Sequence, residues 1–215
     1  MRTLELFAGT QSFSKAVLRD DPTSRTTTVD ILDKFLPHHR ADILTWNYKM
    51  YKPGIFDVIW CSPPCTEYSK AKTRGTRNLE LADKLVLRCF EIIDYYKPKV
   101  WILENVGTGL LVNRMESLRP GLNKYFVDYC AYGKPYRKRT VFWSNIELAM
   151  KSCAGVGKCT SMVGKKHKGS CGNGTTKYNS VGISSVWTKD AIPDLLMDYV
   201  VAECKKNLLP SVDEL

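Results

Sequence analysis

The strongest constraint on the fold is an alternation of short apolar segments with polar or amphipathic ones over the first 145 residues. Apolar segments rich in β-branched and aromatic residues predict strands at 3–7, 26–31, 41–44, 56–61, 100–103, 125–129 and 140–143. Strands separated by helices favour βαβ units and a mostly parallel sheet. We therefore expect an α/β fold with seven strands and helices on both faces.

The predicted helices cover residues 12–19, 79–96 and 190–206. In the second, the apolar residues recur at helical spacing: Leu81, Leu85, Phe90 and Ile93. In the third, the expected apolar face is formed by Ile192, Leu195, Leu196, Tyr199 and Val200. We expect a core over residues 1–150, a small irregular basic lobe over 151–189, and a C-terminal helix over 190–215 that returns to the core.

Positive charge is concentrated in one part of the chain. Residues 134–189 carry 11 Lys or Arg side chains against Glu147 alone, whereas residues 190–215 carry two against six acidic side chains. Such a local field suits a polyanion such as nucleic acid, through phosphate contacts and counterion release. A solvated lysine-rich loop explains the charge alone equally well.

The composition is that of a globular protein, with 44% hydrophobic and 25% charged residues. No apolar run approaches the roughly 20 residues that a membrane span needs, and the N-terminus does not resemble a signal peptide. We therefore expect a soluble, intracellular protein with no membrane partner. The eight cysteines are expected to stay reduced.

The first strand runs into Phe7-Ala8-Gly9-Thr10. A glycine at a strand-to-helix turn lets the backbone approach a ligand, and the helix N-terminus offers free N–H groups. Asp30 ends the second strand, where a carboxylate can bind both hydroxyls of a ribose. Asp42-Ile43 could accept a hydrogen bond from an adenine amino group beside an apolar wall. These parts predict a nucleoside cofactor; an ordinary turn and solvated aspartates are the structural alternative.

A Cys-Ser-Pro-Pro-Cys-Thr-Glu-Tyr-Ser segment follows the fourth strand. Its two prolines stiffen the loop and hold Cys65 at the mouth of the expected cleft. Near a helix N-terminus and basic groups, the pKa of a cysteine falls and its thiolate becomes a nucleophile. A single cysteine is more often a small buried hydrophobe, and this interpretation fits Cys61, Cys89, Cys130 and Cys204.

The fifth strand carries four apolar residues and then Glu104. Burial raises the pKa of such a carboxyl group, so that it can hold a proton near neutral pH. A glutamate at a strand end is otherwise commonly a cap or an ion-pair partner. A catalytic role for Cys65 and Glu104 therefore requires that both face one cleft beside the cofactor site.

In this order the segments resemble the DNA cytosine-5 methyltransferases, and most closely the small cytosine methylases of large double-stranded DNA viruses. The resemblance covers about residues 1–145. The matching motifs are Phe7-Ala8-Gly9, Asp42-Ile43, Pro64-Cys65 with Tyr68-Ser69, Glu104-Asn105-Val106, and the two-arginine motif over 132–140. Gln11 and Thr66 depart from the family pattern, which has glycine and glutamine there, and Ile192-Pro193 is only weakly similar to its last motif.

The resemblance implies a Rossmann-like, S-adenosylmethionine-dependent fold that methylates C5 of cytosine in double-stranded DNA. It implies that Cys65 adds to C6 of a flipped cytosine and that Glu104 stabilises N3. Arg137 and Arg139 would hold the carbonyl or phosphate of that nucleotide. The cofactor would contact Phe7, Ala8, Gly9, Thr10, Asp30, Ile31, Asp42, Ile43, Pro64 and Leu85. A viral protein of this kind would act in the nucleus or cytoplasm of an infected host cell.

Three other functions stay open. An amino-methyltransferase has a similar Pro-Pro loop, although Cys65 stands where those enzymes place an aromatic residue. An RNA cytosine methylase would use the same machinery. A catalytically silent DNA-binding relative would keep the basic lobe, and the short region 151–189 favours that possibility.

The basic lobe contains a candidate metal site. A closed tetrahedral zinc site could be formed by Cys153, Cys159, His167 and Cys171. The Gly- and Lys-rich stretch around them predicts little core of its own, so a metal could fold it. A flexible DNA-contacting loop is the favoured alternative. In either case four lysines are expected near DNA phosphates: Lys158, Lys165, Lys166 and Lys168.

Overall fold

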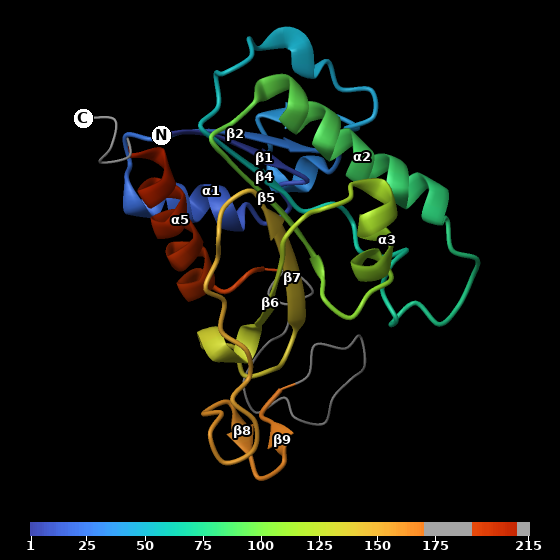
Figure 1. Ribbon diagram of the computed structural model, residues 1–215, viewed down its shortest axis with the longest axis vertical. Helices are drawn as coiled ribbons and strands as arrows, with labels where there is room; N and C mark the ends of the chain where they lie inside the picture. The colour runs from blue at the N-terminus through green and yellow to red at the C-terminus, as the bar shows by residue number, and fades with distance from the viewer. Residues whose placement is uncertain (170–190, 210–215) are drawn as a thin grey trace.

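A seven-stranded sheet of order β3-β2-β1-β4-β5-β7-β6 forms the centre of the computed structural model, which describes residues 1–169 and 191–209 (Figure 1). The strands are β1 (Arg2–Leu6), β2 (Arg25–Asp30), β3 (His39–Arg40), β4 (Val58–Cys61), β5 (Val100–Val106), β6 (Lys124–Asp128) and β7 (Arg139–Ser144). Strands β1 to β5 are parallel to one another, whereas β7 runs antiparallel to both β5 and β6. The predicted α/β fold with a mostly parallel seven-stranded sheet is confirmed.

Helices cover both faces of this sheet (Figure 1). They are α1 (Ser12–Asp20), α2 (Leu79–Tyr96), α3 (Leu111–Leu118) and α5 (Asp194–Leu208), with short 3-10 helices η1 (Asp33–Phe35), η2 (Tyr48–Met50) and η3 (Tyr129–Tyr132). The helices α1 and α5 pack on one face, and α2 and α3 on the other. Because both faces are covered, the central strands must be apolar on both sides.

Strand β4 shows how the sequence meets this requirement. Val58 and Trp60 face the core formed with α1 and α5, whereas Ile59 and Cys61 face the core formed with α2. Phe13 of α1 stacks on Trp60 with ring centroids 5.3 Å apart. All four strand residues are buried, which explains the continuous apolar run in the sequence.

Two parts of the sheet differ from the prediction. The third strand lies at His39–Arg40 and not at 41–44, because the Asp42 carboxylate accepts a hydrogen bond from Leu44 N–H and turns the chain. The fifth strand continues to Val106, so Glu104 lies within it and not at its end. The short helix α3 was not predicted from the sequence.

The packed helix faces also differ in two places. Leu81 of α2 is 44% exposed, and the buried side of that helix is built on residues such as Val86 and Ile93. Leu195 of α5 is 62% exposed, whereas Leu196 is fully buried. On both helices, the predicted apolar face shares some residues with the buried face, but its centre is rotated about the helix axis by part of a turn.

A small two-stranded sheet lies apart from the main one, beyond the end of β6 and β7 (Figure 1). It pairs β8 (Met162–Val163) with β9 (Lys166–His167) across a turn at Gly164, where φ is +59°.

Among the described residues, none of the helices combines the length and apolarity required to cross a membrane.

The packing of α5 can be tested with two adjacent leucines. Leu196→Ala removes a fully buried side chain and is expected to lower the free energy of unfolding by about 2–4 kcal/mol. Leu195→Ala, the matched control, truncates an exposed side chain and is expected to cost less than about 0.5 kcal/mol. Urea unfolding measures both, and equal losses would contradict the observed face.

Candidate active site

A cavity of about 450 Å³ opens beside the carboxyl ends of β1 and β4. The chain winds from β1 toward β2 and β3 on one side and from β4 toward β5 on the other, so these two strands form the topological switch point of the sheet. Parallel α/β sheets bind their ligands at such a point. The cavity lies where the fold predicts a site.

The loop between β1 and α1 forms one wall of the cavity. Its backbone is left-handed at Phe7 (φ 57°), Gly9 (φ 46°) and Gln11 (φ 58°). A residue with a side chain pays about 1–2 kcal/mol for this conformation. Gln11 Nε2 donates a hydrogen bond of 2.6 Å to the Phe35 carbonyl, which offsets part of that cost. The glutamine therefore adopts a left-handed backbone that a glycine would adopt at lower cost.

Asp30 holds this loop in place. Its carboxylate accepts hydrogen bonds from Gly9 N–H and Leu32 N–H, each at 2.8 Å. Neither Asp30 nor Ile31 lines the cavity in the described part of the chain, whereas Leu32 and Phe35 do. The structure therefore shows that Asp30 positions this loop, and its direct contact with a ribose stays a prediction.

Glu5 is a buried acid that the sequence analysis missed, although it interrupts the apolar strand β1. Its carboxylate accepts hydrogen bonds from Ser14 N–H (2.9 Å) and Phe13 N–H (3.3 Å) in the first turn of α1. Burial raises the pKa of Glu5 to about 7, against the lowering effect of the Ser14 hydrogen bonds. Glu5 thus fixes the start of α1 beside the cavity.

Three predicted cofactor contacts lie elsewhere. Asp42 accepts a hydrogen bond from Leu44 N–H, Ile43 is buried in the core formed with α2, and Leu85 packs against the same core. Among the described residues, none of these three lines the cavity. In contrast, the cavity is lined by five of the other residues expected to contact the cofactor: Phe7, Ala8, Gly9, Thr10 and Pro64.

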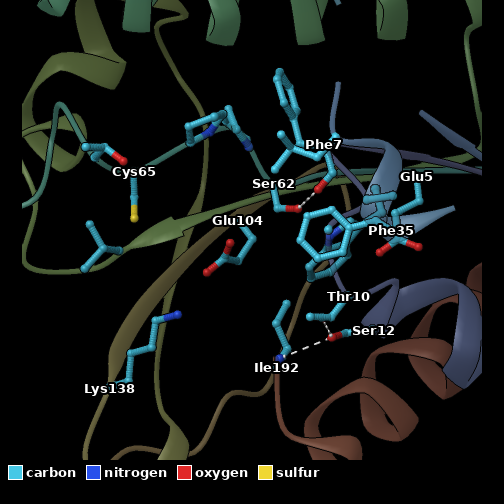
Figure 2. A pocket seen from close by; sticks show the side chains of 18 of the residues that line it. Glu5, Phe7, Thr10, Ser12, Phe35, Ser62, Cys65, Glu104, Lys138 and Ile192 are labelled. Carbon is cyan, nitrogen blue, oxygen red and sulfur yellow. Dashed lines mark hydrogen bonds between the residues drawn. The ribbon is translucent and has the colours of Figure 1, made fainter. Parts of the chain in front are cut away.

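The loop after β4 carries Cys65 into the cavity. Ser69 N–H and Tyr68 N–H donate to the Cys65 carbonyl at 2.8 and 3.0 Å, so the cysteine begins a tight turn. The buried Asn105 side chain donates to the Pro63 carbonyl at 2.9 Å and ties the loop to β5. Ser62 Oγ donates to the Phe7 carbonyl at 3.1 Å and joins the two loops (Figure 2).

Three chemically active groups face the same part of the cavity. Figure 2 shows the Cys65 thiol, the Glu104 carboxylate and the Lys138 amino group directed toward a common space. The neighbouring Tyr129 hydroxyl feels both charges. Burial raises the pKa of Tyr129, the positive charge of Lys138 lowers it, and the negative charge of Glu104 raises it. The Lys138 ammonium also lies over the Tyr129 ring, 5.2 Å from its centroid. A nucleophile, an acid and a cation therefore share one site.

Arg137 and Arg139 do not line this cavity in the described part of the chain, whereas Lys138 between them does. Arg137 Nε donates to one oxygen of the buried Asp128 carboxylate at 2.9 Å, and Arg139 pairs with the other at 3.4 Å. Although burial raises the pKa of Asp128, its hydrogen bonds with Arg137 and Cys153 N–H keep it below the ordinary value. The two arginines thus form an ion-pair network with Asp128, and their contacts with the flipped nucleotide stay predictions. Lys138 could have been found from the alternating directions of side chains in an extended segment.

Ile192 lies on the far side of the cavity and is 8% exposed. Its N–H donates to Ser12 Oγ at 3.2 Å, and Ser12 Oγ lies 3.0 Å from Thr10 Oγ1 (Figure 2). These contacts hold the segment before α5 against the start of α1. A residue near the C-terminus therefore completes a pocket begun by the first strand.

The cysteines fall into two groups. Cys61, Cys89 and Cys204 are buried among apolar side chains, as predicted. Cys130, predicted to be packing only, instead lies with three lobe residues in one cluster: Cys153, Cys159 and His167. Cys171, the fourth predicted ligand, falls outside the described residues. The four lobe lysines are all exposed: Lys158, Lys165, Lys166 and Lys168.

Comparison with known proteins identifies the family. Residues 1–128 match the C-5 cytosine-specific DNA methylases. The chain belongs to this family of DNA cytosine-5 methyltransferases. A Frog virus 3 (isolate Goorha) protein named "Probable DNA (cytosine-5)-methyltransferase" is 40% identical over 177 residues, covering 75% of this chain and 79% of the relative. The type II methyltransferase M.AgeI of Thalassovita gelatinovora is 32% identical over 101 residues, covering 42% of this chain and 23% of the relative.

The solved structure of the Entamoeba histolytica methyltransferase EhMeth is 16% identical to this methyltransferase, with a TM-score of 0.53. It covers 70% of this chain and 56% of the other, and it confirms the methyltransferase fold. The family match also decides against the amino-methyltransferase, because the matched family acts on C5 of cytosine.

The buried carboxyl group of Glu5 predicts a pH-dependent stability. Its pKa in the folded protein, about 7, lies above the ordinary value of 4.5. The folded state therefore binds more protons between these pH values, and the free energy of unfolding falls as the pH rises through them, by up to about 3 kcal/mol. Glu5→Gln is expected to remove this fall, as urea unfolding at pH 5 and pH 7.5 would measure. An unchanged pH dependence would contradict the buried carboxyl group as its source.

Proposed function

We propose that this protein transfers a methyl group from S-adenosylmethionine to C5 of cytosine in DNA through a covalent Cys65 adduct. The observation that carries the proposal is the convergence of Cys65, Glu104 and Lys138 on one cavity. The same cavity continues along the loop between β1 and α1, which leaves room for a methyl donor beside the reactive cysteine.

The loop side of the cavity fits a nucleoside cofactor. Its volume of about 450 Å³ lies within the usual range for small-molecule sites. Gly9 and Thr10 bring backbone close to the start of α1, while Phe35 and Ile192 supply apolar walls. S-adenosylmethionine bound there supplies an electrophilic methyl group. In this proposal Asp30 shapes the pocket through Gly9 N–H.

The Cys65 thiolate would open the reaction by bonding to C6 of the cytosine. This addition would convert the C5=C6 double bond to a single bond and move its π electrons toward C5 and N3, which makes C5 nucleophilic. C5 would then bond to the methyl carbon as the sulfonium–methyl bond of the donor breaks, leaving S-adenosylhomocysteine. Water would take the proton from C5, and the electrons of that C–H bond would re-form the C5=C6 double bond and expel the Cys65 thiolate from C6. Since C5 and C6 cannot be attacked within a base stack, the cytosine must leave the duplex and enter the cavity.

Glu104 and Lys138 would act on the ring as charge builds up on it. In its protonated form, Glu104 would donate a hydrogen bond or a proton to N3. The Lys138 ammonium would stabilise the thiolate before addition and the electron-rich ring after it. The two groups would stabilise the adduct more than the ground state, because the charge that they meet builds up only after addition.

DNA would meet this site through the basic lobe. The four exposed lysines there suit phosphate contacts. Arg137 is 48% exposed despite its bond to Asp128, so it would lie near the entrance of the flipped nucleotide. Because the viral relative shares 40% identity, we further propose that the methyltransferase acts in the nucleus or cytoplasm of an infected host cell.

The mechanism predicts that Cys65→Ala and Cys65→Ser abolish methyl transfer, because both remove the nucleophile and leave the cofactor wall intact. Transfer from radiolabelled S-adenosylmethionine to duplex DNA measures activity, and calorimetry measures cofactor binding, which is expected to persist. The wild type is expected to form a covalent complex with DNA containing 5-fluorocytosine, since fluorine blocks the elimination.

Cys61→Ser is the matched control for the trapping experiment, because Cys61 is buried in the core and still permits a Cys65 adduct. Methylation that survives Cys65→Ala would contradict the mechanism. Turnover on transfer RNA and none on DNA would identify an RNA methylase. Failure of the wild type on both would identify a silent DNA-binding relative.

Lys138→Met tests which basic residue serves the substrate. Loss of a preorganised cation is expected to lower kcat by about 100-fold and to leave cofactor affinity unchanged. The matched control is Lys134→Met, four residues earlier and outside the cavity lining, which is expected to change kcat less than about threefold. Full activity in Lys138→Met with loss in Arg137→Met would restore the arginine as the substrate contact.

A further inference from the structure

The sulfur and imidazole groups of the small lobe gather at one point, away from the active-site cavity. Cys130, Cys153, Cys159 and His167 each offer one ligand atom, and these atoms all lie within 4.8 Å of one another. They come from three separate segments: η3, the chain after β7, and β9. Such convergence from distant parts of a sequence is unusual for thiols that serve only as packing.

The two separations from the imidazole to the cysteine sulfurs match those around a tetrahedral ion. His167 Nε2 lies 3.5 Å from Cys153 Sγ and 3.7 Å from Cys159 Sγ. Zinc bonds of about 2.3 Å to sulfur and about 2.0–2.1 Å to nitrogen place tetrahedral ligand pairs about 3.6 Å apart. We propose that Cys130, Cys153, Cys159 and His167 bind one structural zinc ion.

The backbone supports this ligand set. Gly155 and Gly157 adopt φ values of 83° and 76°, which lets the chain turn tightly between two of the cysteines. Cys159 N–H donates to the Gly155 carbonyl at 2.9 Å, and this hydrogen bond closes the turn between the two cysteines.

Zinc would cross-link a part of the lobe that has little packing within the described residues. The strands of this part are two residues long, and its Val156 and Val163 side chains are 61% and 70% exposed. A unit with so little buried apolar surface needs a cross-link to hold one conformation. Three thiolates and one imidazole fill all four positions of a tetrahedral ion, so the site would be structural and closed to substrate.

The ion would also fix the lobe to the active site. Cys130 belongs to η3, directly after Asp128, and Cys153 N–H donates to the Asp128 carboxylate at 2.9 Å. The same carboxylate pairs with Arg137 and Arg139, which flank Lys138. Zinc would therefore hold the lobe lysines in a fixed position relative to the reacting cysteine.

Metal analysis of the full-length protein, purified without chelator from zinc-supplemented cells, tests the proposal. We expect about one zinc per chain, and loss of the ion in Cys159→Ser and His167→Gln. Cys171→Ser and Cys65→Ser, the matched controls, are expected to keep it. Less than about one tenth of an ion per wild-type chain, or full retention in Cys159→Ser and His167→Gln, would overturn the proposal.

A second measurement needs no variant and no enzymatic activity. Cysteine alkylation of the native protein, followed by peptide mapping, is compared before and after zinc removal by a chelator. We expect Cys130, Cys153 and Cys159 to become reactive together, while Cys65 reacts equally in both states. Replacement by cobalt(II) is expected to give the visible absorption of a tetrahedral, thiolate-rich site. A disulfide between any two of the three cysteines, or unchanged labelling, would contradict zinc binding.

Discussion

Three buried carboxylates hold the loops at the carboxyl edge of the sheet, and the functional site depends on them. Glu5 binds the first turn of α1, and Asp30 binds the loop before it. Asp128 binds Arg137 and the start of the small lobe. A buried carboxylate must find hydrogen-bond donors or lose much of its hydration energy, so each one fixes the backbone around it. These bonds set the shape of the cavity more directly than the apolar cores behind it.

The two sides of the cavity are built differently. The side proposed for the cofactor consists mainly of backbone in left-handed conformations, with Phe35 and Ile192 as apolar walls. The side proposed for catalysis consists of side chains carried by rigid elements: Cys65 on a proline loop, Glu104 within β5 and Lys138 just before β7. Asn105 and Ser62 link these parts through hydrogen bonds to carbonyl groups. A shared rigid frame of this kind keeps reacting groups in register with a bound cofactor.

The small lobe illustrates how a short chain can extend a catalytic core. It has two-residue strands and little apolar surface, yet it connects to the core through Asp128 and Cys130. Under the zinc proposal, one metal ion would take the place of a hydrophobic core in the lobe. The exposed lysines of the lobe would then contact the DNA backbone. The Asp128 carboxylate would then connect the zinc-bound lobe to Arg137 and Arg139, which flank Lys138.

The sequence by itself determined where most of the core strands lie along the chain, the position of α2 and the placement of Cys65 in a loop after β4, because these follow from local periodicity and from prolines at a strand end. It also showed a glutamate at the fifth strand. Only the tertiary structure decided that Lys138 reaches the cavity while Arg137 pairs with Asp128, since the partner lies on another strand. It likewise brought Cys130 to the lobe cysteines. Contacts between distant segments depend on packing, which local patterns do not encode.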